Sequence, residues 1–264
     1  MQIYQNIQKI TGANECAGCG TTFEQALLTT PFGVIVQRFC KACVEKEEIK
    51  EKAIRKQNQE KSHKEWLKKL NVKERYDNST LQNYKPLNQS QSEALQACYK
   101  LQNKEITKLV LLGSNGLGKT HLASALVKAN NGLLMTAYEM FATYRACFNA
   151  NSKHTELDVI NRLSTVPLLA IDEFGRTKGS EAEENFLSVI IDNRHSNDLP
   201  TLILSNLIRK RDCVFFDANN PDRCKSCQRN DCLESRITKD VLSRLRENSS
   251  VVYMTGEDYR KQSK

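Results

Sequence analysis

A glycine-rich stretch at residues 113–120 has the composition of a phosphate-binding loop. It reads Gly-Ser-Asn-Gly-Leu-Gly-Lys-Thr, between a short apolar run and a helical pattern over residues 120–129. Glycines let backbone N–H groups turn towards phosphates, and a helix N-terminus adds partial positive charge. We expect Lys119 to reach the β- and γ-phosphates of a nucleotide and the Thr120 hydroxyl to ligate Mg²⁺. The other predicted nucleotide-binding positions of the loop are Gly113, Ser114, Asn115, Gly116, Leu117 and Gly118.

Two adjacent acids follow the next strongly apolar run. Residues 166–171 are apolar and lead into Asp172 and Glu173, about fifty residues beyond the glycine-rich loop. That interval accommodates the helix, strand and helix expected between two strands of a nucleotide-binding sheet. We expect Asp172 to hold Mg²⁺ through water and Glu173 to polarise the water that attacks the nucleotide.

A third apolar strand, at residues 200–205, is followed by Asn206. Ligands of open α/β sheets bind outside the carboxyl ends of the strands. Asn206 is therefore predicted to position the attacking water or to sense the γ-phosphate. The alternative is that Asn206 caps a turn, a position that asparagine favours.

The spacing of the first four cysteines is typical of a zinc site. Ten cysteines occur in the chain, and Cys16-x-x-Cys19 is separated from Cys40-x-x-Cys43 by twenty residues. This is the spacing of a zinc ribbon or knuckle. Four thiolates would complete a tetrahedral zinc site and leave no open position, so the predicted metal is structural.

A second set of cysteines has a less regular spacing. Four residues separate Cys224-x-x-Cys227 from Cys232, and ten residues separate it from Cys213 upstream. We expect a second zinc here, with an iron–sulfur cluster or free thiols as alternatives. A metal would organise a loop that is otherwise polar.

Composition limits the class of protein and its partners. The formal net charge is +8 with a sequence pI of about 8.9, which favours a nucleic-acid partner, although solubility alone could explain the excess. No apolar run is long enough to span a bilayer, and the first residues lack a secretory leader, so a cytoplasmic location is expected.

Three domains are expected along the chain. Residues 1–44 form the zinc module, residues 45–75 a charged helical linker with i,i+4 pairs such as Glu51/Arg55, and residues 76–264 an α/β domain with a cysteine-rich insertion at 213–232. Strands alternate with helices in the third domain, which predicts a parallel sheet. The expected strands are 109–112, 133–137, 166–171, 202–205 and 251–254, and the expected helices are 90–103, 120–129, 138–148, 157–163 and 181–193.

These motifs together resemble the AAA+ helicase-loader family, which includes bacterial and phage loaders of the DnaC/DnaI type and the IstB transposition ATPases. The resemblance covers roughly residues 76–264. Four stretches carry it: 113–120; 168–175; 193–194 with 199–206; and 241–245 with the Gly-Glu-Asp-Tyr-Arg ending at 256–260. It implies a P-loop AAA+ core without a C-terminal lid, with the N-terminal cysteine module as the helicase-binding domain.

The resemblance also implies a role for Arg244. In the family, an arginine at this place completes the ATP site of a neighbouring subunit, so Arg244 is assigned as the arginine finger, and self-association through ATP sites is expected. From the residues alone, Arg236 and Arg246 are also available. The cysteine-rich insertion departs from the family pattern. A metal there is hypothesised to fix the Arg244 helix or to present Arg223, Lys225 and Arg229 to DNA.

The expected function is an Mg²⁺-dependent ATPase (ATP and water to ADP and phosphate) that loads a hexameric replicative helicase onto single-stranded DNA. Candidate DNA contacts are Arg176, Thr177 and Lys178, with Lys153 nearby, and binding through such residues would depend on salt. Phe174 could stack on a base or pack in the core. The alternatives are an IstB-like ATPase that regulates a transposase on duplex DNA, and a zinc adaptor that binds ATP without needing turnover.

Overall fold

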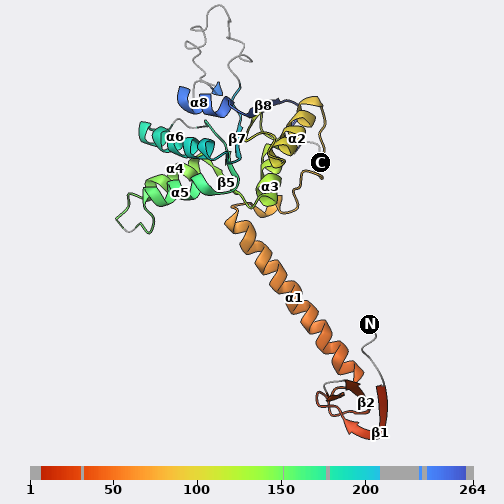
Figure 1. Cartoon of the computed structure of the whole chain (residues 1–264). Coiled ribbons are helices and arrows are strands. Elements are labelled where there is room, and N and C mark those ends of the chain that lie inside the picture. The colour runs from red at the N-terminus through yellow and green to blue at the C-terminus, as the bar shows by residue number, and fades with distance from the viewer. Residues whose placement is uncertain are drawn as a thin grey trace, which may run out of the picture. The chain divides into compact units, whose positions relative to one another are not determined.

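The computed structural model describes residues 7–30, 33–150, 152–176, 179–208, 232–233 and 237–259. Of these, the side chains of 7–13, 25–30, 33–35 and 59–60 are not described. The chain divides into two compact units, Met1–Glu65 and Trp66–Lys264 (Figure 1). In the described part of the chain, no helix is both long and apolar enough to cross a membrane.

The first unit contains an antiparallel sheet and most of a long helix. Its strands β1 (Ile7–Glu15), β2 (Thr22–Thr30) and β3 (Gly33–Val36) pair in the order β1-β2-β3. Helix α1 (Lys41–Lys69) begins between the two cysteines of the second pair, four residues before the predicted start of the linker. Cys43 therefore lies in the first turn of α1.

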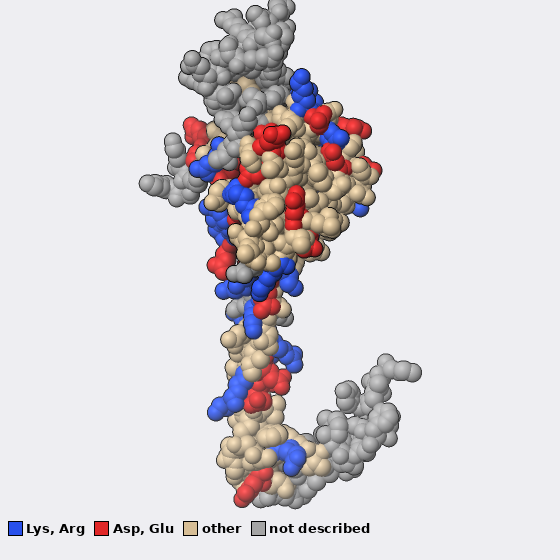
Figure 2. Space-filling view, turned by 90° about the vertical axis from the view of Figure 1, so that its left-hand side faces the viewer, with Lys and Arg blue, Asp and Glu red and all other residues tan. Residues whose placement is uncertain are grey.

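Charged side chains cover α1. Lys and Arg side chains are interspersed with Glu along its surface, between uncharged side chains (Figure 2). Its ion pairs include Lys41–Glu45, Glu47–Lys50 and the predicted Glu51–Arg55, at 3.9, 3.2 and 3.3 Å. Such exposed pairs each contribute well under about 1 kcal/mol. The described side chains of the helix before Trp66 are accessible to solvent. Leu67, in the last turn, and Leu70, directly after the helix, are buried in the core of the second unit.

The second unit is a three-layer α/β domain built on a five-stranded parallel sheet. The strand order is β5-β6-β7-β4-β8, which confirms the predicted fold class. The strands are β4 (Lys108–Gly113), β5 (Leu133–Thr136), β6 (Leu169–Asp172), β7 (Thr201–Ser205) and β8 (Ser249–Met254). The helices are the 3₁₀ turn η1 (Glu74–Tyr76), α2 (Gln89–Gln102), α3 (Lys119–Ala129), α4 (Ala137–Ala146), α5 (Glu156–Thr165), α6 (Glu181–Ser196) and α8 (Lys239–Arg246).

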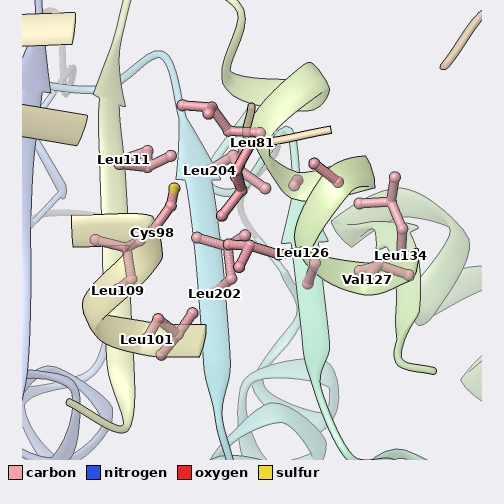
Figure 3. Packing of buried hydrophobic residues seen from close by; sticks show 14 of the residues in the cluster. Leu81, Cys98, Leu101, Leu109, Leu111, Leu126, Val127, Leu134, Leu202 and Leu204 are labelled. Atoms are coloured by element: carbon pink, nitrogen blue, oxygen red, sulfur yellow. The ribbon is translucent and has the colours of Figure 1, made fainter. Parts of the chain in front are cut away.

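Alternate residues of each strand point into two separate cores. Leu109 and Leu111 of β4 pack with α2 and α3, whereas Val110 and Leu112 face the side of α4, α5, α6 and α8. Figure 3 shows the first core, where side chains of β4 and β7 meet those of α2 and α3. Because both faces are covered, the strands read as continuous apolar runs, as expected of a parallel sheet.

Capping residues already visible in the sequence begin three of the helices. Thr136, Thr155 and Ser180 each form a capping box with the acid three residues later, at the starts of α4, α5 and α6. The observed helices and strands overlap every predicted one in this unit. The main difference is β6, which begins at Leu169 because Val166 still caps α5 and Pro167 has no N–H to donate.

One buried arginine joins the layers on the side of α6. Arg194 is 1% exposed and donates to the carbonyl oxygens of Leu163, Val166 and Pro200, at 2.9, 2.8 and 2.6 Å, and to the Thr201 hydroxyl at 3.0 Å. Burial lowers its pKa to about 10. These bonds tie α6 to the segments that enter β6 and β7, the two strands that deliver Asp172 and Asn206.

Candidate nucleotide site

The glycine-rich loop connects β4 to α3, as predicted, and its glycines are required by the backbone. Gly113, Gly116 and Gly118 have φ of 134°, 81° and 84°, in the left-handed region that other residues rarely adopt. A Cβ on Gly113 would also lie 2.2 Å from the Met254 carbonyl oxygen of β8. The loop is thus fixed by the neighbouring strand as well as by its own turns.

Lys119 lies at the first position of α3, with its ammonium inside the loop. Its Nζ donates to the carbonyl oxygens of Gly113 and Ser114, both at 2.7 Å, and to Asn206 Oδ1 at 3.0 Å. The side chain is buried, and this desolvation lowers its pKa to about 8, while the Asp172 carboxylate opposes the shift. A phosphate at this place would restore the stability of the ammonium form.

Thr120 and Asp172 meet at the mouth of the loop. The Thr120 hydroxyl donates to Asp172 Oδ2 at 2.8 Å, and Asp172 is the last residue of β6. A hydroxyl and a carboxylate side by side are hard oxygen donors of the kind that Mg²⁺ binds together with phosphate oxygens. The donor set therefore fits the predicted magnesium ion.

Glu173 follows directly and adopts an unusual backbone conformation. Its φ is 53°, and its N–H donates to Asp172 Oδ1 at 2.7 Å. This geometry turns the Glu173 carboxylate to a half-exposed position, where Oε2 accepts from Arg176 Nη1 at 2.9 Å. A non-glycine residue in this region of φ is strained, and such strain is often found at functional sites.

Asn206 reaches the loop because of the strand order. Strand β7 lies between β6 and β4, so the residue after β7 emerges between the acids and the glycine-rich loop. Its Oδ1 accepts from Lys119, and its Nδ2 donates to Asn115 Oδ1 at 3.0 Å. The side chain is therefore part of the site. Phe174, in contrast, is 4% exposed and packs in the core, the second of its two predicted roles.

A pocket of about 520 Å³ opens over these residues, and its lining includes residues that the sequence did not assign to a nucleotide site. Tyr84 donates from its hydroxyl to the Leu117 carbonyl at 2.9 Å, and the N–H of Tyr259 donates to the Gly116 carbonyl at 3.0 Å. The two rings lie 6.3 Å apart at the pocket wall. Tyrosines near the two ends of the domain thus brace the same loop, a contact that no local spacing indicates.

His121 is a further lining residue, although the sequence analysis gave the histidines no role. Its Nε2 lies 3.1 Å from the Thr80 carbonyl oxygen and 3.0 Å from Asn83 Oδ1, and its ring faces Tyr84 at 5.6 Å. Burial lowers its pKa, which favours the neutral ring. His121 therefore ties α3 to the segment before α2 that forms one wall of the pocket.

Arg244 lies on α8 and does not line this pocket. It is about one-third exposed and forms an ion pair with Asp192 of α6. The assignment of Arg244 as an arginine finger for a second copy remains a prediction. Arg236, one of the two alternatives to Arg244, lies outside the described residues.

The four N-terminal cysteines come together as predicted. The sulfur atoms of Cys16, Cys19, Cys40 and Cys43 all lie within 4.8 Å of one another. Cys16 Sγ accepts from the N–H groups of Cys40 at 3.1 Å and Gly18 at 3.4 Å. Mainly through the Cys40 bond, these contacts lower the pKa of Cys16 to about 6. Clustered thiols with N–H···S bonds form a donor set that fits tetrahedral zinc.

The second cysteine set falls mostly outside the described residues. Beyond them lie Cys213, Cys224 and Cys227, together with Arg223, Lys225, Arg229, Thr177 and Lys178. Cys232 is buried and forms a β-bridge with Ile208 next to β7. The prediction of a second metal here remains a prediction.

Comparison with known proteins places the chain among ATP-binding proteins. The family model described as IstB-like ATP binding protein matches residues 34–221. The chain is 32% identical over 152 residues to a protein of Buchnera aphidicola subsp. Acyrthosiphon pisum named replicative helicase loader DnaC, and the match covers 54% of this chain and 62% of that protein. The chain therefore spans less than two thirds of that relative's length.

Solved structures show the same fold. A crystal structure of the DnaC helicase loader, 23% identical, matches 69% of this chain and all of that one, with a TM-score of 0.53. AMPPCP-bound DnaA from Aquifex aeolicus, 17% identical, matches 69% of this chain and 52% of that one at 0.50. With its parallel sheet and P-loop, the second unit is an AAA+-type core, and the chain belongs to the family of IstB-like ATP-binding proteins.

Proposed function

We propose that this protein is an ATP-dependent loader of a replicative DNA helicase that acts on single-stranded DNA. The observation that carries the proposal is the joint presence of Lys119, Thr120, Asp172, Glu173 and Asn206 around one pocket. These residues bind a nucleotide and can also promote its hydrolysis. The relatives named replicative helicase loader favour this function among those of the family.

The roles of the residues follow from their positions. Lys119 binds the β- and γ-phosphates. The oxygens of Thr120 and Asp172 would hold Mg²⁺, which would neutralise phosphate charge when bound. Glu173 accepts a proton from the attacking water. Asn206 orients that water or the γ-phosphate from the opposite side. The product is ADP and phosphate.

Hydrolysis is completed between subunits. Arg244 projects from the surface, and an arginine supplied in trans stabilises the charge of the transferring phosphoryl group, by about 10³–10⁵ in rate. ATP would thus drive head-to-tail self-association. Single-stranded DNA contacts Arg176 and the residues that follow it, with Lys153 on a separate exposed segment.

The first unit provides the contact to the hexameric helicase. Its zinc module, residues 1–44, belongs to a different compact unit from the ATPase core. A structural zinc would keep its short strands folded without taking part in chemistry. This division lets ATP turnover in one unit release a partner held by the other.

A second candidate is an ATPase that regulates a transposase on duplex DNA, which the name of the matched family favours. A third, a zinc adaptor that binds ATP without turnover, is disfavoured by Glu173, which such an adaptor does not need. The nucleic acid distinguishes the first two: a loader prefers single strands, and a transposition ATPase prefers duplex.

The test is affinity capture with Glu173→Gln in ATP, a variant expected to bind nucleotide and not hydrolyse it. Lys119→Ala is the matched control that does not retain ATP. Recovery of the replicative helicase with Glu173→Gln, its loss with Lys119→Ala, and its loss on deleting residues 1–44 would support the loader and the role of the zinc module. Recovery of a transposase, together with duplex preference, would replace this proposal by the second candidate.

A further inference from the structure

Arg244 is held by an acid from a different helix. Its Nε forms an ion pair with Asp192 Oδ1, and Asp192 belongs to α6, about fifty residues earlier in the chain. Its Nη1 donates to the carbonyl oxygen of Asp240, one turn back on α8, at 3.3 Å. Nη2 makes no hydrogen bond to the described residues. Among the described residues, the guanidinium is therefore engaged through Nε and Nη1.

The two helices that carry this pair are fixed by packing. Val241 and Leu245, which flank Arg244 on α8, are 1% and 2% exposed and share a core cluster with Ile190 and Ile191 of α6. Thr238 caps the start of α8. Because α8 is short, this packing and its contact to α6 set its orientation. Asp192, directly after the two isoleucines, is thus placed within reach of Arg244.

The exposure of the ion pair indicates that it affects the orientation of the Arg244 side chain more than the stability of the fold. The side chains of Arg244 and Asp192 are 34% and 41% exposed, so the pair contributes little to folding. An arginine side chain without such a partner, however, samples many rotamers, and it loses that entropy when it binds in one geometry. An acid that holds the arginine in one rotamer before the reaction removes most of this entropy loss.

We propose that Asp192 is a positioning residue, which holds the Arg244 guanidinium with Nη2 directed towards the phosphates of the nucleotide bound by a second copy of this chain. This inference rests on the proposed function, in which Arg244 acts in trans. Asp192 does not line the nucleotide pocket of its own chain. It acts through Arg244 alone, so its loss affects the neighbour's site and leaves its own chain's site complete.

The experiment compares Asp192→Ala and Asp192→Asn with the unmodified protein and with Arg244→Ala. Asp192→Ala is expected to lower kcat about tenfold or more, because a misplaced catalytic group can cost up to about 10² in rate. Asp192→Asn, which keeps an acceptor oxygen, is expected to have a kcat between those of Asp192→Ala and the unmodified protein. Nucleotide affinity stays unchanged in all of them. Glu181→Gln, an exposed acid on the same helix, is the matched control and keeps full activity.

Mixing subunits separates positioning from a structural defect. Glu173→Gln has an inactive site of its own and a correctly held Arg244. Asp192→Ala keeps an intact Glu173 in its own site, but its Arg244 is misplaced. In a 1:1 mixture, about a quarter of the sites pair an intact Glu173 with a correctly held neighbouring Arg244, as random head-to-tail assembly gives. Activity per site should therefore rise clearly above that of either variant alone. Recovery in the mixture is the result expected of an acid that acts only on the neighbour.

Three outcomes would overturn the inference: full or increased turnover in Asp192→Ala, reduced nucleotide affinity in that variant, or a mixture with no recovery although Arg244→Ala recovers in the same assay. The failure of the proposed function looks different. If Arg244→Ala itself hydrolyses ATP at the normal rate, Arg244 does not act in trans, whatever Asp192 does. If Glu173→Gln still turns over, Glu173 is not the base of the proposed reaction.

Discussion

The nucleotide site and the four-cysteine module are both binding sites, but they are held together in different ways. Around the nucleotide site, the strand residues Leu109–Leu112 are at most 1% exposed, and the loop is braced by β8, Tyr84 and Tyr259. In the first unit, Cys16 is the one buried apolar residue among the described side chains at 14–24, 36–58 and 61–65. The nucleotide site is supported by a packed hydrophobic core, whereas the four-cysteine site is supported mainly by its own thiol ligands.

This difference indicates what each unit needs in order to fold. A parallel sheet covered on both faces buries enough apolar area to be stable without its nucleotide. A small sheet with few buried side chains depends on a staple, which here is the metal that the cysteines would bind. Perturbations of the two regions should therefore act independently and differ greatly in size.

The largest expected effect is the loss of the first unit's structure in Cys16→Ser. Structural zinc supplies about 10–16 kcal/mol to the folding of small metal-binding modules. The variant should lose bound zinc at this site, and its residues 1–40 should become sensitive to protease. The ATP-stabilised melting transition of the second unit should keep its midpoint.

Cys147→Ser is the matched control for this experiment. Cys147 lies at the end of α4 in the second unit, where its thiol donates to the Thr143 carbonyl oxygen at 3.4 Å, and its replacement should leave the zinc content unchanged. If Cys16→Ser keeps its zinc and its protease resistance, the first unit does not depend on Cys16 as a metal ligand. That result would contradict the proposed difference between the two units.

Two glycines give the next largest contrast. Gly113→Ala would put a Cβ 2.2 Å from the Met254 carbonyl oxygen at a φ of 134°. We expect a loss of about 2–4 kcal/mol in the unfolding free energy of the second unit, from strain and overpacking. Gly20 in the first unit has a φ of 71°, and a Cβ added there would meet nothing within 4 Å, so Gly20→Ala should cost only about 1 kcal/mol.

Denaturant titrations that follow each unit separately measure this contrast. Equal losses for the two variants would mean that β8 gives way at Gly113, and the loop would then be less firmly braced than its contacts indicate. The difference between the two regions would then be limited to the dependence of the first unit on its metal.

Much of the nucleotide site could be predicted because its signals are local. Apolar runs locate β4, β6 and β7, and the polar residues that end them lie together because parallel strands share one carboxyl edge. Contacts such as Tyr259 to Gly116 or Asp192 to Arg244 join segments far apart in sequence, and no spacing indicates them. In the first unit, cysteine spacing predicted the cluster, but β1 and β2 have too few patterned apolar residues for their pairing to be predicted.

The third prediction concerns pH and is confined to the nucleotide site. The pKa of Lys119 is about 8, below the usual 10.5, because the ammonium is desolvated. Phosphate binding requires the protonated form, so above pH 8 binding must take up a proton. The affinity for ATP should then fall by up to about tenfold per pH unit between pH 8 and 10. Fluorescent-nucleotide titrations measure it.

Lys119→Ala is the control for the pH dependence. It should bind ATP weakly, with an affinity that does not change over this range. An unmodified protein whose ATP affinity is constant between pH 8 and 10 would place the Lys119 pKa near its ordinary value, which contradicts the burial that sets the nucleotide site apart from the exposed cysteine module.

The smallest expected effect compares the same kind of ion pair in the two regions. Arg176 pairs with Glu173 at 2.9 Å, and Arg55 pairs with Glu51 of α1 at 3.3 Å, both with half-exposed or exposed side chains. Each pair contributes less than about 1 kcal/mol, so neither matters for folding. Only the first one engages a carboxylate that the proposed reaction uses. Arg176→Gln should free Glu173 and raise DNA-independent ATP hydrolysis by up to about fivefold.

Arg55→Gln, the matched variant, should change neither hydrolysis nor stability. A phosphate group of DNA that binds Arg176 would compete with Glu173 for the guanidinium, so Arg176→Gln should also respond less to added single strands than the unmodified protein does. Unchanged basal hydrolysis in Arg176→Gln would mean that Glu173 is as available in the pair as outside it. The two ion pairs would then be equivalent, and the nucleotide site would differ from the first unit in its packing alone.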